Sequence, residues 1–200
     1  MAYGDFTLEA IVEQENLRIQ DASIFPVVDP VVPSDWLQDL LSSSAIIGLF
    51  SGTEKSRSEF IVVPILMDIE RRNRDQFTIF SGKNFDVDRS KGLNGECDFI
   101  LSKGQPTRLI QAPIFALVEA KKQDIDIGLG QCVAQMIGAQ LFNQRKHQPI
   151  DRIYGCVTTG DRWQFLKLEK QDLMIDRLEY SLANNLPDIL GFFQLVLAHL

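Results

Sequence analysis

The sequence contains few of the side chains on which nucleophilic and zinc chemistry depend. Histidine occurs only twice in 200 residues, at His147 and His199, so histidine-based acid–base chemistry is not expected. The three cysteines, Cys97, Cys132 and Cys156, are widely spaced, which argues against a disulfide framework or a zinc knuckle. No Ser-His-Asp set, Walker loop or internal repeat is present. Any catalysis must therefore rest on other groups.

Long apolar runs and an excess of basic charge are also missing. No apolar stretch is long enough to span a bilayer, and the amino terminus lacks a charged leader followed by an apolar core. With the unpaired cysteines, this leads us to expect a cytoplasmic protein without membrane contact. The net charge of −7 counts against nucleic-acid binding, because phosphate recognition usually draws on a basic surface. The basic clusters 71–74 and 145–147 are better explained as partners of helix dipoles.

The composition suits one soluble domain over residues 1–200. A hydrophobic fraction of 45% with 24% charged residues is enough to build a substantial core. Periodicity and turn residues predict alternating strands and helices, and hence an α/β fold. The expected strands lie within 6–20, 77–80, 95–101, 114–122, 152–157 and 162–168, the last two forming a hairpin that finishes the sheet. The expected helices lie within 36–41, 53–73, 124–148 and 186–200, the last of them strongly apolar.

Two of these strands carry a pattern of charges. The first contains Asp98, and the second is an apolar run whose charges, Glu119 and Lys121, come only at its end. Glycine and proline break the segment between them, which predicts an antiparallel hairpin with Asp98 beside Glu119. Oxygen ligands of this kind suit a magnesium ion that keeps several of its waters. The sequence therefore predicts Asp98 and Glu119 as ligands of Mg²⁺, with Mn²⁺ as a substitute ion.

A further carboxylate lies on the helix expected over 53–73. Thr53 is its expected N-cap, and Pro64 is expected to kink it. Helical spacing places Glu59 on an otherwise apolar face, where a charge needs a partner. An equally weighted alternative is that Glu59 reaches water or pairs with Lys55 or Arg57.

The helix after the second charged strand carries two glutamines. Gln131 and Gln135 lie four residues apart and share a face that could reach the carboxylates, although glutamine is also common on solvated helices. Small residues such as Gly138 would let this helix lie close on the sheet. Gly128 and Gly130 lie in its first turn, where backbone N–H groups could meet a phosphate.

The ordered set of helix Glu, strand Asp, strand Glu-x-Lys and helix Gln resembles the PD-(D/E)XK nuclease superfamily. It is similar to the amino-terminal nuclease domains of type I restriction subunits, and Cys97 stands where the superfamily's name has proline. The resemblance implies a restriction-endonuclease-like core with a mixed central β-sheet flanked by helices. On this basis we expect an amino-terminal extension over 1–52, a nuclease-like core over 53–168 and a carboxy-terminal helical segment over 169–200.

The resemblance implies a magnesium-dependent phosphodiesterase, an endonuclease-like enzyme acting on DNA. Asp98 and Glu119 would hold the metal, which would lower the pKa of a water that attacks phosphorus. Lys121 would orient that water or stabilise the developing charge. Glu59 would support the metal through an intervening water, and Gln131 or Gln135 would position the lysine or the phosphate.

A second hypothesis is a non-catalytic nucleic-acid or protein binding module, a scaffold on the same fold. The acidic net charge favours it. The carboxylate pair disfavours it, because a scaffold has no physical need for two adjacent, uncompensated like charges. Between the two lies a subunit whose nuclease is switched on by a partner. The sequence leaves open whether the chain works as a homodimer or with a partner subunit.

Overall fold

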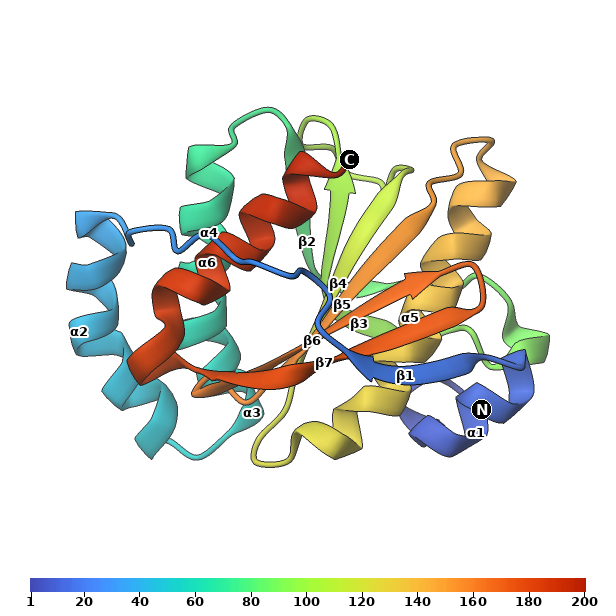
Figure 1. Cartoon of the computed structure of the whole chain (residues 1–200), viewed down its shortest axis with the longest axis horizontal. Coiled ribbons are helices and arrows are strands. Elements are labelled where there is room, and N and C mark those ends of the chain that lie inside the picture. Colours follow the sequence, from blue (N-terminus) through green and yellow to red (C-terminus); the bar gives the residue numbers. More distant parts are fainter.

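The computed structural model describes residues 1–200 and shows helices flanking both faces of one seven-stranded sheet (Figure 1). This confirms the predicted α/β class with a mixed central sheet. The strands are β1 (Arg18–Ala22), β2 (Phe77–Asn84), β3 (Glu96–Lys103), β4 (Ile114–Ala120), β5 (Arg152–Thr158), β6 (Arg162–Glu169) and β7 (Asp172–Ser181). Their order is β1-β7-β6-β5-β4-β3-β2, with β1–β7 and β4–β5 parallel and the other neighbours antiparallel.

Six α-helices surround the sheet, and none is long and apolar enough to cross a membrane. They are α1 (Leu8–Glu15), α2 (Asp35–Phe50), α3 (Glu54–Arg57), α4 (Val63–Arg72), α5 (Ile125–Arg145) and α6 (Leu182–Ala198). Helix α5, with α1 packed against it, covers one face; α4 and α6 cover the other, with α2 packed on the outer side of α4 (Figure 1).

Strand β4 lies between these two layers, and all its residues are buried. Leu117 joins the apolar cluster under α5, whereas Val118 joins the cluster on the opposite face. Burial of each large apolar side chain contributes roughly 1.5–3 kcal/mol, so packing on both faces holds the strand firmly. The charged residues at the end of β4 are thereby fixed in position.

The prediction of strands within residues 6–20 is wrong for the first half of that segment, which forms helix α1. Thr7 caps α1, its Oγ1 accepting a hydrogen bond from Ala10 N at 3.2 Å, and Asn16 ends the helix with a φ of 52°. Leu8, Ile11 and Val12 have helical spacing, and Ile11 is fully buried. The second half does form an edge strand, β1, as expected.

The carboxy-terminal segment also differs from expectation. The chain after residue 168 was expected to be helical, but it begins with β7, so the β5–β6 hairpin does not finish the sheet. Lys170, with a φ of 56°, turns the chain between β6 and β7. Helix α6 then packs across the sheet, where Phe192 stacks on Phe165 with ring centroids 3.7 Å apart.

Helix α2 is longer than the helix predicted over 36–41. The serines after it were expected to interrupt the helix, but they bond back to the backbone instead. Ser42 Oγ donates to Asp39 O at 2.7 Å, and Ser43 Oγ donates to Leu40 O at 3.1 Å. Ser44 Oγ reaches across to Phe60 O at 2.7 Å. The helix therefore continues and packs on the next helical segment.

The single helix predicted over 53–73 is divided by a π-helical turn over Ser58–Val62, between α3 and α4. Thr53 caps α3 as predicted, its Oγ1 accepting from Ser56 N at 3.0 Å. Pro64 lies in the first turn of α4, where its missing N–H costs least. The π turn changes which side chains share a face, because it inserts an extra residue into the helical repeat.

Candidate active site at the end of β4

The predicted antiparallel hairpin is formed by β3 and β4. Phe99 pairs with Val118, and one step further along this register Asp98 comes opposite Glu119. At that point Asp98 Oδ2 accepts a hydrogen bond from Ala120 N at 2.7 Å. The hairpin thus brings together the two carboxylates that the sequence analysis paired.

Glu119 is the most constrained side chain of this group, with a relative exposure of 1%. Its Oε1 accepts from Lys121 Nζ at 2.7 Å, and its Oε2 accepts from Gln135 Nε2 at 2.8 Å. Burial raises the pKa of Glu119 to about 7 and Asp98 adds to the increase, while Lys121 and Gln135 oppose it. The charged and neutral forms of this carboxyl group are therefore both populated near neutral pH.

Lys121 is the only cation in direct contact with this carboxylate. Burial acts to lower its pKa, but the negative charge of Glu119, with smaller effects of Glu54 and Asp98, raises it overall. Its Nζ also donates to Gln131 Oε1 at 3.1 Å. The ammonium group is thus charged and held from two sides.

Both predicted glutamines of α5 reach the cluster. Gln131 contacts Lys121, and Gln135, which is fully buried, contacts Glu119. The other amide atom of Gln135, Oε1, is buried without a hydrogen-bond partner. An unpaired buried acceptor is costly. The hydrogen bond to Glu119 thus holds the Gln135 amide in an orientation that leaves its oxygen without a partner.

Glu59 does not join the buried group. It lies in the π turn, its side chain is 54% exposed, and its Oε1 is 3.8 Å from Lys55 Nζ. The extra residue of the π turn breaks the spacing that placed Glu59 on a buried face. Of the two alternatives, the exposed pair with Lys55 is therefore the one that the structure has. Glu59 still lines the mouth of the cleft that leads to Asp98.

The sequence analysis missed Glu54, the first residue of α3. Glu54 lines the same cleft as Asp98, a hollow of about 340 Å³ between α3 and strands β2 and β3. Burial raises its pKa, and Lys121 opposes this while Asp98 adds to it. An acidic residue in a first helical turn is ordinary, because it complements the helix dipole. The sequence therefore carries no signal that separates Glu54 from Glu59.

The cleft is markedly acidic. Four carboxylates line it, together with the exposed ammonium of Lys55; the carboxylates are Glu54, Glu59, Glu96 and Asp98. A larger hollow of about 510 Å³ lies beside the amino-terminal residues 4–9, but none of the residues that line it belongs to the group formed by Asp98, Glu119 and Lys121, whereas Asp98 lines the smaller cleft. The smaller cleft is therefore the candidate site.

The donor set is compatible with magnesium. No group of three or more His, Cys, Asp or Glu side chains is close enough to form a metal site by itself. Mg²⁺ is commonly held by one or two carboxylates and keeps several waters. Asp98 and Glu119 supply two carboxylates, and with Glu54 they outnumber the single positive charge of Lys121. A divalent cation would balance this excess.

The glycines in the first turn of α5 do not form an open phosphate site. A Cβ on Gly130 would lie 2.4 Å from Phe6 O, and one on Gly128 would lie 2.5 Å from a side-chain carbon of Val157. Both glycines therefore permit close packing. Gly138 serves the amino-terminal segment rather than the sheet, since its Cβ would lie 2.4 Å from the hydroxyl of Tyr3.

The glycine-containing loop before Asp98 is held in place along its length. Asp88 and Leu93 form an isolated bridge, and Tyr3 N donates to Asn94 O at 2.9 Å. The strand expected over 77–80 also runs further, to Asn84, before this loop. The amino-terminal segment thus packs against both this loop and α5.

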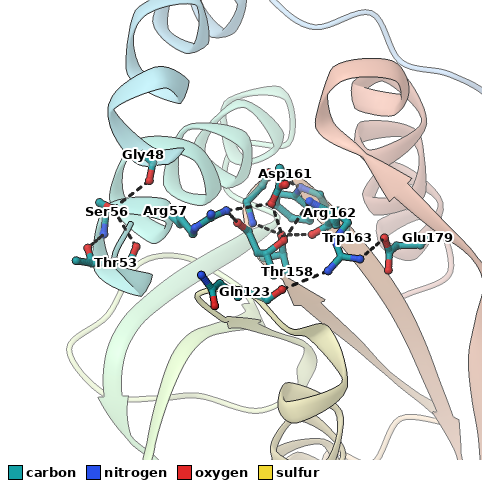
Figure 2. A network of polar contacts seen from close by, with 12 residues as sticks. Gly48, Thr53, Ser56, Arg57, Gln123, Thr158, Asp161, Arg162, Trp163 and Glu179 are labelled. Carbon is teal, nitrogen blue, oxygen red and sulfur yellow. Dashed lines mark hydrogen bonds and ion pairs between the residues drawn. The ribbon is translucent and has the colours of Figure 1, made fainter. Parts of the chain in front are cut away.

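The turn between β5 and β6 contacts the loop after β4, where Arg162 Nη2 donates to Gln123 O at 3.2 Å (Figure 2). Thr158 and Thr159 were expected either to approach the metal site or to close the turn. They close it, since Thr158 Oγ1 donates to Arg162 O at 2.8 Å. Thr158 O also accepts from Lys121 N at 2.7 Å, which ties the turn to the end of β4.

Comparison with known protein sequences does not assign a role to this site. No family model matches the chain, and no curated protein sequence matches it. The resemblance to the PD-(D/E)XK superfamily rests on the order of residues along the chain and on the contacts described above.

Proposed function

We propose that the protein is a magnesium-dependent phosphodiesterase that cleaves DNA, with a restriction-endonuclease-like core over residues 53–168. The order of elements supports this core: an antiparallel β3–β4 hairpin carries Asp98 and Glu-x-Lys, and α5 and the parallel strand β5 follow. The observation that carries the proposal is the buried Glu119, held by Lys121 and Gln135 beside further carboxylates. Glu119 lies directly behind the cleft, between its neighbour Ala120 and the facing Asp98, both of which line it, and a strongly perturbed group at a cleft is typical of a functional site.

Asp98 and Glu119 would hold the metal ion in this proposal. The bound ion would supply a water of lowered pKa and a positive charge next to the phosphate. Lys121, oriented by Gln131 and Glu119, presents a cation to the phosphate and stabilises negative charge that develops on its oxygens. Gln135 keeps Glu119 turned toward the end of β4, so it is a positioning residue.

The acidic cleft makes the metal a requirement for substrate binding as well as for chemistry. Glu54, Glu59, Glu96 and Asp98 would repel a phosphodiester, and the net charge of −7 adds to this. A divalent ion would neutralise two of the negative charges and offer a ligand position to phosphate. DNA is the partner we propose, bound with the help of the ion.

The test is cleavage of plasmid and linear DNA in Mg²⁺ and in chelator, with Lys121→Met as the diagnostic variant. We expect cleavage only with the metal and a loss of about 10²-fold in Lys121→Met, because a positioned charge next to the phosphate is removed. The neighbouring Lys122 is exposed and serves as the matched control, so Lys122→Met should cleave like the parent. Equal rates in Lys121→Met and the parent would contradict the assigned role of Lys121.

A non-catalytic binding module is the second candidate. It is favoured by the acidic charge and by the existing partners of Glu119, which already satisfy both carboxylate oxygens. If the parent cleaves neither single-stranded nor double-stranded DNA or RNA with Mg²⁺ or Mn²⁺, this candidate replaces the phosphodiesterase.

A further inference from the structure

Arg57, the last residue of α3, extends from the cleft side of the molecule toward the β5–β6 turn (Figure 2). Its side chain is 13% exposed. Nη1 donates to Thr159 O at 2.5 Å and to Asp161 Oδ1 at 3.0 Å. A guanidinium is costly to bury without partners, and its Nε is buried with none. The position therefore calls for an explanation beyond surface pairing.

Helix α3 (Glu54–Arg57) is the free end of a helical stretch that continues through the π turn into α4, because Arg57 and Ser58 have right-handed helical dihedrals. Helix ends fray, so side-chain contacts decide how firmly this first turn is held. Ser56 ties it to α2, its Oγ donating to Gly48 O at 3.0 Å (Figure 2). Arg57 supplies the tie toward the sheet. Together with the continuity of α3 with the π turn, these two anchors hold the helix end that carries Glu54.

The β5–β6 turn that receives Arg57 is rigid. Thr158 Oγ1 accepts from Gly160 N at 2.9 Å, and Thr159 Oγ1 donates to Asp161 Oδ1 at 2.7 Å. Trp163 Nε1 donates to Gly160 O at 3.0 Å. Gly160 has a φ of 82°, which a residue with a side chain rarely adopts. These hydrogen bonds within the turn therefore hold it in one conformation.

The same turn fixes the end of β4. Lys121 N donates to Thr158 O at 2.7 Å, and Arg162 Nη2 donates to Gln123 O at 3.2 Å (Figure 2). Helix α3, which carries Glu54 on one side of the acidic cleft, and the end of β4, whose Ala120 lines the cleft and precedes Lys121, are therefore attached to one short segment. Their spacing is set through this turn.

We infer that Arg57 is a positioning residue, which holds Glu54 opposite Asp98 and Lys121 by anchoring α3 to the β5–β6 turn. The inference rests on the proposed phosphodiesterase function and deepens it, because it adds Glu54 to the working site and gives Arg57 a role through Glu54. An arginine suits this role, since one guanidinium reaches a backbone carbonyl and a carboxylate in a fixed geometry.

A double-mutant cycle tests the inference. Arg57→Met should lower kcat for DNA cleavage about tenfold, because Glu54 leaves its place, while the affinity for Mn²⁺ stays within twofold of the parent. In the Glu54→Gln background, Arg57→Met should cause no further loss of kcat, because the two residues act as one unit. Additive losses would overturn the inference, since a purely structural tie acts independently of Glu54.

Arg72→Met is the matched control. Arg72 lies in α4 of the same helical layer, is 30% exposed and pairs with Asp68 at 2.8 Å, away from the cleft. We expect this variant to lose stability without a change in kcat at a temperature where it is folded. Arg57→Lys should recover part of the activity lost in Arg57→Met, because an ammonium still reaches one of the two acceptors. A fall in kcat for Arg72→Met equal to that for Arg57→Met would count against a specific role of Arg57.

A readout without turnover separates this inference from the proposed function. The Glu54 carboxyl can be titrated by NMR in the full chain, where burial raises its pKa. In Arg57→Met the pKa should return toward its ordinary value, and in Arg72→Met it should match the parent. Absence of cleavage by the parent would contradict the phosphodiesterase alone. An unchanged titration of Glu54 in folded Arg57→Met would overturn the positioning role itself.

Discussion

Two carboxylates, Asp68 in α4 and Glu119 in β4, are each 1% exposed, and each has one cation and one neutral partner. Asp68 accepts from Arg72 Nε at 2.8 Å and from Ser34 Oγ. Glu119 accepts from Lys121 at 2.7 Å and from Gln135 at 2.8 Å. Burial and pairing alone therefore do not distinguish them.

The difference lies in the surrounding charges. Asp68 and Arg72 balance each other, and the group fastens the start of α2 to α4, since Ser34 caps α2 and Arg72 Nη2 donates to Val32 O at 2.7 Å. Around Glu119 the carboxylates of Asp98 and Glu54 exceed the single charge of Lys121. Like charges gathered around a buried carboxylate are costly to the fold. The imbalance, not the burial, is what makes the end of β4 the candidate functional site.

The largest expected difference between the two carboxylates is in catalysis. Glu119→Gln should reduce the single-turnover rate of DNA cleavage by about 10³-fold, because it removes a metal ligand and the partner of Lys121. Asp68→Asn, assayed at a temperature where it is folded, should cleave like the parent. Comparable losses in both variants would mean that the effect is one of folding.

The pH dependence of stability should also separate the two. The pKa of Glu119 is raised to about 7 in the folded chain, so between its ordinary value and 7 the folded state binds more protons than the unfolded state. The contribution of this group to stability is therefore fully present at low pH and decreases as pH rises toward 7, by about 3 kcal/mol at most. Urea unfolding of parent and Glu119→Gln from pH 5 to 8 measures it. A difference that does not vary with pH would refute this assignment.

The expected order of stability at neutral pH is the reverse of the order of activity. Asp68→Asn should lower the free energy of unfolding by about 2 kcal/mol, because it breaks a buried pair whose cation is only partly exposed. Glu119→Gln should change it by less than about 1 kcal/mol, since relief from repulsion offsets the lost ion pair. Urea denaturation at pH 7.5 measures both. A large destabilisation by Glu119→Gln would make Glu119 a structural residue like Asp68.

The smallest expected difference between the two regions is in DNA affinity, measured under conditions where DNA is bound but not cleaved. With Ca²⁺ as a non-reactive ion, the parent should bind DNA several-fold more tightly than in chelator, because the ion offsets the charge of Asp98 and Glu119. The increase should vanish in Asp98→Asn and persist in Asp68→Asn. Fluorescence anisotropy at fixed ionic strength measures it. Equal affinity with and without Ca²⁺ would favour recognition elsewhere on the protein.

The charged hairpin was predictable because its signals are local. An apolar run that ends in Glu119 and Lys121, after a segment with glycine and proline, specifies a buried strand in a hairpin. Helical spacing likewise placed Gln131 and Gln135 on one face, and the structure brings both to the cluster. Strand alternation and helix periodicity thus predicted most of the site.

The remaining features depend on contacts distant in sequence or on a single inserted residue. Glu54 and Glu59 cannot be told apart from the sequence, because the π turn that shifts Glu59 outward is not encoded in a periodic pattern. Helix α1 is short and gains its stability by packing against α5, where Gly130 admits its backbone. The β7 strand depends on pairing with β6 and β1, which no local pattern reveals.

Calorimetric titration with Mn²⁺ tests the central claim most directly, namely that the charge excess at the end of β4 is a divalent-cation site. The parent should bind one ion, and Asp98→Asn should weaken binding at least tenfold, because it removes a ligand charge while keeping its shape. Glu96→Gln, which neutralises an exposed carboxylate of the same cleft, should bind as the parent does. Equal binding by Asp98→Asn and the parent, or no binding by the parent, would contradict the account.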